Sequence, residues 1–519
     1  MGRYTFSLVL NAHTPFIRHP EVDRVMEEQW FFEALSDTYL PLLELCNRLE
    51  ADHVPFRLGL VLSPTLCHSF QDTLLIQRYL DYVDHQIEFG QAEQTRAAGY
   101  PDRQHLAQLF CDAVAEKKKR FIHQYDKKIL EAFKYFQRKG SIELLLTTAT
   151  NAFLPFYTAY PESIQAQFET AIINFRSIFG RYPQGFFLPE MSWTPSLDSY
   201  LRAYHFAYTI VDTHGLLLGN PPAQKGIFYP VKTPLGIFVL GRNFNMPQFS
   251  QHTVYRDHNC DAGFEFPADL VSAFQASDGA RMSTGYRYYN KAQGLYDPDA
   301  AARQAAQDAH EFLATRLDEF QEIKQYMAED ALDLYVLNAD QFGRFWSEGI
   351  CFLEALFREI AQHSPDCCVA TAAEYLYTQN IACFQTMTPE FSSWGNNGYA
   401  ETWLDSSNDW IYRHLLQATI RMTELAERFP NAVGIKERTL NQAAREILLA
   451  QNSDWTKMLH RQEYTDYARR QVTDSLRNFT TIYEALGGSY LNMEWLTELE
   501  RRHNIFPDIN YRVFRRRIL

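Results

Sequence analysis

Several polar side chains that could do chemistry stand at the ends of short apolar runs. Glu190 follows the run that begins at Gly185, and Asn338 and Asp340 follow the run that begins at Leu332. A carboxylate in such a place can act as a nucleophile or a general acid–base, or it can belong to a structural ion pair. An amide has no titratable proton, so Asn338 can orient an oxygen but cannot protonate it. Further polar residues follow other runs: Asn11, His13, Asn151, Asp212, His214 and Arg242.

The apolar runs themselves predict a parallel α/β fold. They alternate with helical stretches such as Glu27–Leu49 and Pro161–Phe179, and they are nearly continuous in apolar residues, as buried parallel strands are. Seven such runs indicate a closed or nearly closed barrel, one unit short of the usual (β/α)8 arrangement, with its chemistry at the C-terminal strand ends. The predicted strands are Thr5–Asn11, Phe56–Ser63, Ile142–Thr148, Gly185–Pro189, Phe206–Asp212, Gly236–Arg242 and Leu332–Asn338.

Two parts of the chain fall outside this alternation. Residues ~75–140 are polar and helical, and we expect them to form an excursion from a barrel domain that spans residues 1–400. In residues 401–519 helix periodicity takes over, which predicts a C-terminal all-helical domain. Its helices are expected at Ile411–Phe429, Leu440–Leu449, Tyr464–Leu486 and Met493–Arg502.

The composition excludes several classes of function. Of 519 residues, 46% are hydrophobic and 22% charged, the balance of a globular protein. A net charge of −14 disfavours nucleic acid and anionic membrane surfaces as partners, and no run approaches the ~20 apolar residues of a membrane helix. The eight cysteines form no C-x-x-C and no secretory signal is visible, so we expect a thiol-reduced, cytoplasmic protein. No metal-ligand spacing or phosphate-binding glycine motif is present, so we expect no metal and no cofactor.

Segments in a fixed order along the chain carry the motifs of one enzyme family. Val9–Pro20 (VLNAHTPFIRHP), Ala149–Pro155 (ATNAFLP), Gly185–Trp193 (GFFLPEMSW) and Leu337–Gly349 (LNADQFGRFWSEG) resemble motifs of glycoside hydrolase family 57, in its branch of 1,4-α-glucan branching enzymes. The likeness runs from about residue 5 to residue 511. Further similar segments are Leu58–Leu66, Val211–Gly215, Ser392–Trp410, Leu440–Trp455 and Asn504–Asp508.

The resemblance implies a fold, a ligand and a reaction. It implies an incomplete (β/α)7 barrel with a C-terminal helical domain, and α-1,4-glucan or malto-oligosaccharide as the ligand. Retaining transfer uses two carboxyls ~5–5.5 Å apart, of which one attacks the anomeric carbon and the other protonates the leaving oxygen. By resemblance Glu190 is the nucleophile, whereas the acid–base aspartate is replaced by Asn338. Loss of general acid–base help typically costs ~10²–10⁴-fold in rate.

Other positions of the implied sugar site are also informative. Asn11 and Asn151 stand where the family has histidines, Arg344 also replaces a histidine, and the stretch Asn243–Thr253 is short beside the loop of branching enzymes. Aromatic residues reach 15% of the chain, a surplus that suits stacking on sugars as well as core packing. Trp394 and Trp403 lie among Gly, Asn and Ser, which favours a stacking platform. The substrate-binding residues that the resemblance implies are Asn11, His13, Trp30, Asn151, Asp212, His214, Arg242, Trp394, Trp403 and Trp410.

Three functions are compatible with these residues. The first is an α-glucan-binding relative of the enzymes with little or no turnover, because Asn338 cannot supply a proton. The second is an active branching enzyme or amylase-like transferase that uses Glu190 with Asp340 as its acid. The third is a metal-dependent polysaccharide deacetylase-like enzyme with Asp212 and His214 as ligands, although the flanking histidines of such sites are missing. We favour the first.

Overall fold

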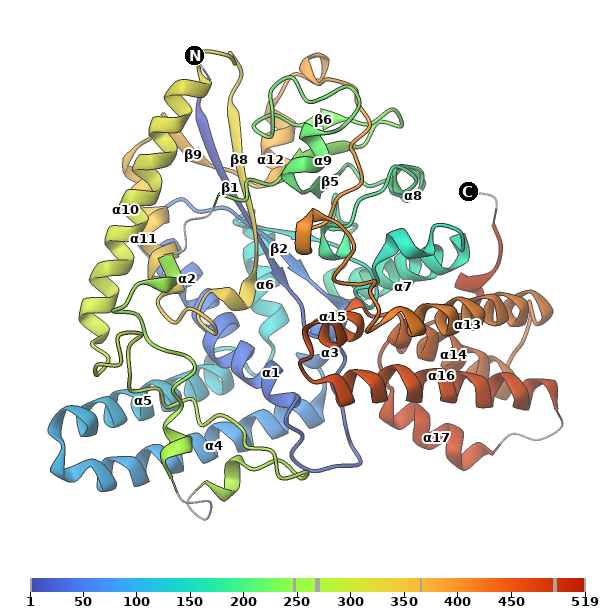
Figure 1. Cartoon of the computed structure of the whole chain (residues 1–519), viewed down its shortest axis with the longest axis horizontal. Helices are drawn as coiled ribbons and strands as arrows, with labels where there is room; N and C mark the ends of the chain where they lie inside the picture. Colours follow the sequence, from blue (N-terminus) through green and yellow to red (C-terminus); the bar gives the residue numbers. More distant parts are fainter. Residues whose placement is uncertain (1, 246–248, 267–270, 365, 489–491, 518–519) are drawn as a thin grey trace.

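Parallel strands form the centre of the molecule in the computed structural model (Figure 1). The structure describes residues 2–245, 249–266, 271–364, 366–488 and 492–517. Its two sheets have the strand orders β3-β2-β1-β8, with β9 added at β1, and β4-β5-β7-β6, and only the pair β6–β7 is antiparallel. The strands are β1 (Tyr4–Ala12), β2 (Leu58–Leu62), β3 (Ile142–Leu145), β4 (Gly185–Phe186), β5 (Tyr208–Val211), β6 (Val231–Lys232), β7 (Phe238–Gly241), β8 (Ala331–Asn338) and β9 (Cys367–Val369).

The two sheets meet at two seams, which makes a nearly closed barrel. At the first seam Leu146 and Phe186 form a parallel bridge beside the ends of β3 and β4. At the second, the backbone N–H of Asn243, just after β7, donates to the carbonyl of Leu334 in β8 at 2.7 Å. The predicted incomplete (β/α)7 barrel is therefore confirmed, and each of the seven predicted runs overlaps one of its strands. The short strands β6 and β9 were not predicted.

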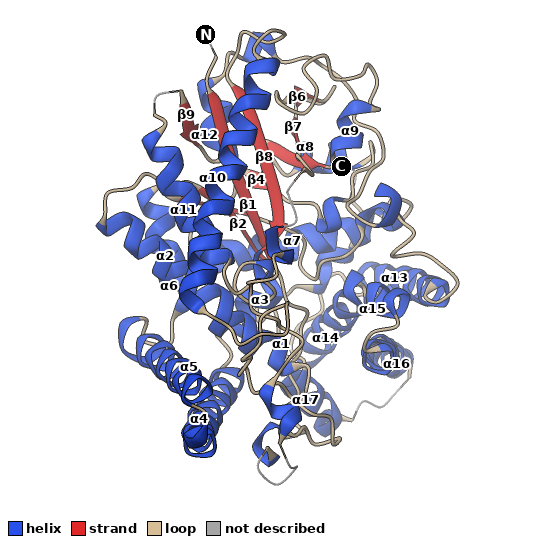
Figure 2. Cartoon of the chain, turned by 60° about the vertical axis from the view of Figure 1, so that its left-hand side comes forward, coloured by secondary structure: helices blue, strands red, loops and turns tan. Residues whose placement is uncertain are grey.

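Helices cover the outside of this barrel (Figure 2). The predicted helix Pro161–Phe179 has its expected bounds, with Pro161 in the first turn and Gly180 at φ 65° after the last, a conformation that glycine adopts without strain. The predicted stretch Glu27–Leu49 becomes two α-helices joined by a π-helical turn at Ala34–Tyr39. The helices of the barrel are α1 (Glu28–Glu33), α2 (Leu40–Ala51), α3 (Pro64–Ser69), α6 (Ile129–Lys139), α7 (Pro161–Phe179), α8 (Leu197–Ala203), α9 (Thr213–Leu217), α10 (Pro298–Ile323), α11 (Gly349–Gln362) and α12 (Ala372–Thr378).

The helical excursion is a pair of long helices, α4 (Thr73–Arg96) and α5 (Pro101–Lys119), which lie side by side and project from the barrel in Figure 1. The chain then returns through α6, which contacts β3 and α2. Among the described residues, no helix is both long and apolar enough to cross a membrane.

The C-terminal part is helical, as the sequence predicted (Figure 1, orange to red). Its helices are α13 (Asp409–Arg428), α14 (Ile435–Ala450), α15 (Ser453–Arg461), α16 (Thr465–Gly487) and α17 (Met493–Arg502), of which α15 was not predicted. A small apolar cluster that includes Ile411, Trp455 and Val472 lies within these helices, but Met422 and Ile447 belong to the same buried core as β1. Because the main core continues across residue 400, the domain boundary at 400/401 stays a prediction.

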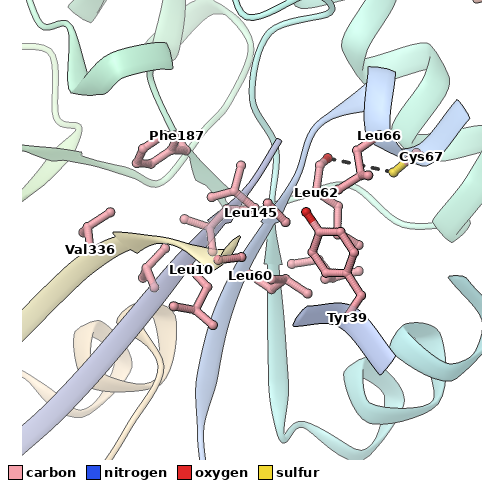
Figure 3. Packing of buried hydrophobic residues seen from close by; sticks show 14 of the residues in the cluster. Leu10, Tyr39, Leu60, Leu62, Leu66, Cys67, Leu145, Phe187 and Val336 are labelled. Atoms are coloured by element: carbon pink, nitrogen blue, oxygen red, sulfur yellow. Dashed lines mark hydrogen bonds between the residues drawn. The ribbon is translucent and has the colours of Figure 1, made fainter. Parts of the chain in front are cut away.

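The strand register sets the positions of the candidate site residues. All nine residues of β1 are buried, as expected for a strand covered on both faces. Leu10, Leu60, Leu145, Phe187 and Val336 pack around these strands in Figure 3, each at most 1% exposed. In the pairing of β1 with β8, Val9 is opposite Val336 and Asn11 is opposite Asn338. Side chains alternate along a strand, so the two asparagines lie next to each other on the same face of the sheet as the two valines.

Asp333 of β8 is a buried hydrogen-bond acceptor at the second seam. Its carboxylate is 2% exposed and accepts hydrogen bonds from Tyr4 Oη at 2.7 Å, Asn243 Nδ2 at 2.8 Å and Tyr335 Oη at 3.1 Å. Burial raises the pKa of Asp333, against the opposing effect of these donors. The carboxylate therefore joins β1, β8 and the end of β7.

We expect Asp333→Leu to lower the melting temperature strongly. The substitution leaves buried donors without an acceptor, at about 1–3 kcal/mol each. Thermal unfolding followed by circular dichroism measures the change. Asp318→Leu, on the exposed face of α10, is the matched control and should change stability by no more than about 0.5 kcal/mol. Equal melting temperatures for the two variants would show that the seam does not depend on Asp333.

Candidate active site

Glu190 follows β4 on a strained backbone. Pro189–Met191 form a 3-10 turn in which Glu190 has φ 58° and Met191 φ 52°. This left-handed region is unfavourable for residues with a β-carbon and costs about 1–3 kcal/mol per residue. Such strain persists only where the surroundings determine the conformation, and it is concentrated at functional sites. The side chain of Glu190 is 3% exposed, so a carboxylate is buried here at a second cost.

Three hydrogen-bond donors hold both oxygens of this carboxylate. Asn151 Nδ2 and Ser453 Oγ each donate to Oε1 at 3.2 Å, and Trp394 Nε1 donates to Oε2 at 2.6 Å. Asn151 Nδ2 also donates to Ser453 Oγ at 3.1 Å, which leaves the serine proton for Glu190. The donors come from the loop after β3, from α15 and from the loop before α13. Together they fix the carboxylate and stabilise its negative charge.

Helix α15 supplies site residues that the sequence reasoning missed. Asn452 caps this helix by accepting from the N–H of Asp454 at 2.9 Å, and the N–H of Ser453 donates to the carbonyl of Asn151 at 3.1 Å. The helix therefore begins directly on the loop after β3. It brings Ser453, Asp454, Lys457, His460 and Arg461 to the candidate site. The available signal was the capping triplet Asn452–Asp454 ahead of two apolar residues at helical spacing, Trp455 and Leu459.

At the strand ends, Asn11 and Asn338 pair through their side chains. Asn11 Nδ2 donates to Asn338 Oδ1 at 3.2 Å. The Oδ1 atom of Asn338 therefore accepts a hydrogen bond within the protein, and its NH₂ group remains as a donor. The position can polarise a substrate oxygen, but it has no proton to transfer.

Asp340 lies in the turn that follows β8. Burial raises the pKa of its carboxyl, against the opposing charges of Arg344 and Lys457. Arg344 Nη1 lies 3.7 Å from Asp340 Oδ2, and its Nε donates to Glu33 Oε2 at 3.1 Å. A carboxyl with a raised pKa keeps its proton to a higher pH, which is what a general acid requires.

His13 is held by an acidic partner from α15. Its Nε2 lies 2.6 Å from Asp454 Oδ2, and both side chains are largely buried. Burial acts to raise the pKa of Asp454, but the contact with His13 holds the pKa below its ordinary value. This pair and the Ser453 hydroxyl connect α15 to residues at the strand ends.

Two adjoining cavities meet at Glu190. The smaller, about 170 Å³, and the larger, about 330 Å³, share Glu190, Asn338, Trp394 and Lys457. Asp340 and Asp454 line the smaller cavity, and Arg461 lines the larger one. The structure thus brings these predicted site residues together at the two cavities: Asn11, His13, Trp30, Asn151, Glu190, Arg242, Asn338, Asp340, Trp394 and Trp403.

Three predicted site residues do not line either cavity. Asp212 caps α9 by accepting from the N–H of Thr213 at 2.7 Å and forms an ion pair with Arg242 at 2.6 Å. His214 Nε2 contacts the carbonyl of Gly398 at 2.7 Å and so supports the loop that carries Trp394. Trp410 packs against the apolar cluster of the C-terminal helices. A direct role of these three residues in binding sugar stays a prediction.

These contacts also bear on the metal hypothesis. Asp212 is engaged by Arg242, and His214 is engaged by a backbone carbonyl. In the part of the chain that the structure describes, no three His, Cys, Asp or Glu side chains are grouped so as to hold a metal ion. The deacetylase-like hypothesis therefore has no ligand set among these residues.

The tryptophans differ from the sequence prediction. Trp394 is half-buried, and the guanidinium carbon of Arg242 lies 5.8 Å from the centroid of its ring. Trp403, predicted as an exposed stacking platform, is 1% exposed, and its ring stacks on Phe153 at 4.6 Å. The prediction was wrong because the polar loop folds back over the ring. Trp30 is half-buried beside Tyr464 and lines the smaller cavity.

Part of the stretch 243–253, predicted to be a short loop over the site, consists of residues 246–248, which lie outside the described residues.

Comparisons with known proteins identify relatives over the whole length. The sequence model of glycosyl hydrolase family 57 matches residues 7–382, and that of the 1,4-alpha-glucan branching enzyme, C-terminal, matches residues 414–514. The chain is 24% identical to the 1,4-alpha-glucan branching enzyme TK1436 of Thermococcus kodakarensis, over 98% of this chain and 78% of that protein. It resembles the structure of the alpha-amylase AmyC from Thermotoga maritima with a TM-score of 0.92 and 30% identity, over 100% of both chains. For the GH57-type branching enzyme from Pyrococcus horikoshii the TM-score is 0.89 at 22% identity, over 100% and 98% of the chains, which shows a shared fold.

The contrast between the two loop tryptophans can be tested directly. Trp394→Ala should weaken malto-oligosaccharide binding by about 1–3 kcal/mol, because its half-buried ring offers a face to sugar at the junction of the cavities. Trp403→Ala should instead lower stability by about 3–5 kcal/mol, because its ring is core. Calorimetric titration and thermal unfolding of both variants measure the two effects. A loss of affinity in Trp403→Ala alone, with unchanged stability, would reverse the assignment.

Proposed function

The chain belongs to glycosyl hydrolase family 57, and on this premise we propose that it binds α-1,4-glucan at a retaining glycosyl-transfer site with weak turnover. The similar proteins are named as branching enzymes and an α-amylase, which supports α-glucan as the ligand. Glu190 is the nucleophile of this proposal. Asn338 occupies the place of the acid–base and cannot perform its role.

The environment of Glu190 supports the nucleophilic role. Attack on an anomeric carbon requires an ionised carboxylate held in one orientation at an accessible cavity. Glu190 is buried, receives three hydrogen bonds and lines both cavities. Attack would form a glucosyl ester on Glu190 and release the leaving oxygen with its electron pair. That oxygen needs a proton, because a sugar alkoxide is a poor leaving group.

The missing proton is the feature that limits the reaction. At Asn338 the leaving oxygen would meet an amide NH₂ whose partner oxygen is already bonded to Asn11. A hydrogen bond from this group polarises the bond being broken but transfers no proton. The expected penalty on an unactivated glucan is ~10²–10⁴-fold. The amide at position 338 is thus the observation that leads us to propose weak turnover in place of ordinary branching or hydrolysis.

Restoring the carboxyl should restore the reaction. Asn338→Asp should raise activity on amylose by ~10²-fold or more, the range assigned to general acid–base help. New α-1,6 linkages, reducing ends and iodine staining report branching and hydrolysis separately. The unmodified protein should still consume α-glucosyl fluoride, because fluoride leaves with little protonation, and Glu190→Gln should abolish both reactions. Asn338→Ala is the control, because it removes the amide without adding a carboxyl, and it should show no gain.

Two results would count against this proposal. No gain in Asn338→Asp, together with no fluoride reaction, would mean that the changes at positions 11 and 151 have also disabled substrate positioning. No affinity for any malto-oligosaccharide at millimolar concentration would remove the sugar site itself.

The raised pKa of Asp340 favours a second candidate, an active branching or amylase-like enzyme with this residue as its acid. Asp340 lines the same cavity as Glu190 and Asn338. The unmodified protein would then act strongly on amylose, and Asp340→Asn would abolish the activity. Because the acid must be protonated, kcat/KM would fall as pH rises through the raised pKa. Arg344→Met removes a cation that lowers this pKa, so it would shift the alkaline limb to higher pH, and an unmoved limb would exclude Asp340.

A further inference from the structure

The larger cavity is cationic, although the protein as a whole is anionic. The chain carries a formal charge of −14. Yet the described lining of this cavity contains Arg242, Lys457 and Arg461 and a single carboxylate, that of Glu190. The smaller cavity contains three carboxylates, those of Glu190, Asp340 and Asp454, and two cations, Arg344 and Lys457. The two cavities therefore differ in charge.

Two of the three cations form no ion pair with a described residue, although Lys457 also lines the smaller cavity with Asp340 and Asp454 and acts on both carboxyls. Lys457 and Arg461 form no salt bridge with any residue that the structure describes. Arg242 gives one Nη to Asp212, but its buried Nε has no partner among the described residues. Arginine and lysine side chains that converge on one cavity are the usual means of binding a phosphoryl group.

The asparagine at position 338 fits the same chemistry. A carboxylate there would repel an anion in the larger cavity, whereas the amide is neutral. Because Asn338 Oδ1 accepts from Asn11, its NH₂ group is the part left to donate. Gln341, Asn396 and Thr402 add further neutral hydrogen-bonding groups to the lining. The substitution that removes a proton donor thus also removes a negative charge.

We propose that the larger cavity binds the phosphate leaving group of an activated glucosyl donor, a glucosyl 1-phosphate or a nucleoside diphosphate glucose. This inference rests on the proposed function for the nucleophile and for glucan as the acceptor. The sugar occupies the smaller cavity and the phosphate the larger, and Glu190 lines both.

The reaction balances without an acid at position 338. A carboxylate oxygen of Glu190 bonds to C1, and the bond between C1 and the phosphate oxygen breaks with its electron pair on that oxygen. When the donor is a glucosyl phosphate monoanion, the group that leaves is hydrogen phosphate, so the required proton is already on the leaving group. A glucan hydroxyl then attacks C1, the bond to Glu190 breaks, and hydrogen phosphate takes the hydroxyl proton. The products are an extended glucan and dihydrogen phosphate.

The test measures phosphate release and glucan extension from α-glucose 1-phosphate, with maltohexaose as acceptor. Release should require Glu190 and be abolished in Glu190→Gln. Lys457→Met and Arg461→Gln should each raise the KM for the phosphate donor about tenfold, the effect of one lost charge-assisted hydrogen bond. Arg469→Gln, on the exposed face of α16, is the matched control and should leave KM unchanged. Calorimetry with inorganic phosphate should show weaker binding in Lys457→Met and Arg461→Gln than in the unmodified protein and the control. Glu190→Gln should retain phosphate binding.

Parallel assays show which of the two donors supplies the phosphate. They also distinguish failure of the phosphate proposal from failure of the proposed function. Release of ADP from ADP-glucose, with α-glucose 1-phosphate inert, assigns the donor to the nucleotide sugars. If α-glucosyl fluoride is consumed through Glu190 while neither phosphate donor reacts, the phosphate proposal is overturned and the proposed function stands. If fluoride is inert and maltohexaose does not bind, the proposed function fails as well. Equal KM values in Lys457→Met, Arg461→Gln and the control would overturn the assignment of the cavity.

Discussion

The structure of the site depends on one constraint, the burial of the Glu190 carboxylate on a left-handed turn. Burial and backbone strain both oppose this arrangement, so it requires donors that are already in place. Those donors come from Asn151, Trp394 and Ser453, which belong to three separate parts of the chain. The barrel, the loop before α13 and helix α15 must therefore all be docked before the carboxylate is satisfied.

This constraint explains why the C-terminal helices share a core with the barrel. Helix α15 begins where Ser453 donates its N–H to the carbonyl of Asn151, and Asp454 contacts His13 within the same turn. A helical part attached by a free linker could not hold these atoms at hydrogen-bond distance. The continuous packing from β1 to Met422 and Ile447 supplies the necessary rigidity.

The sequence predicted those features that depend on local pattern. Apolar runs that end in polar residues located the seven parallel strands and put Asn11 and Asn338 at strand ends, but their hydrogen bond was not predicted. Helix α15 was missed because it has only nine residues, so that Trp455 and Leu459 alone mark its helical spacing. Trp403 was misplaced because its loop is polar in sequence and folds over the ring only through tertiary contacts with Phe153. Long-range docking of this kind leaves little trace in local periodicity.

Under the proposed function, the three asparagines of the site keep its hydrogen bonds but supply no titratable proton. Asn11 and Asn338 satisfy each other, and Asn151 still supports Glu190, so the cavity keeps its hydrogen bonds. A site that only bound neutral glucan would gain stability from a neutral residue at position 190, because the cost of burying a charge would fall. The retained carboxylate with its three donors therefore argues for a site that still uses a nucleophile. If Asn338 supplies no acid, as we propose, such a nucleophile acts best on a donor whose leaving group departs unaided, and the charges beside Glu190 favour an anionic one.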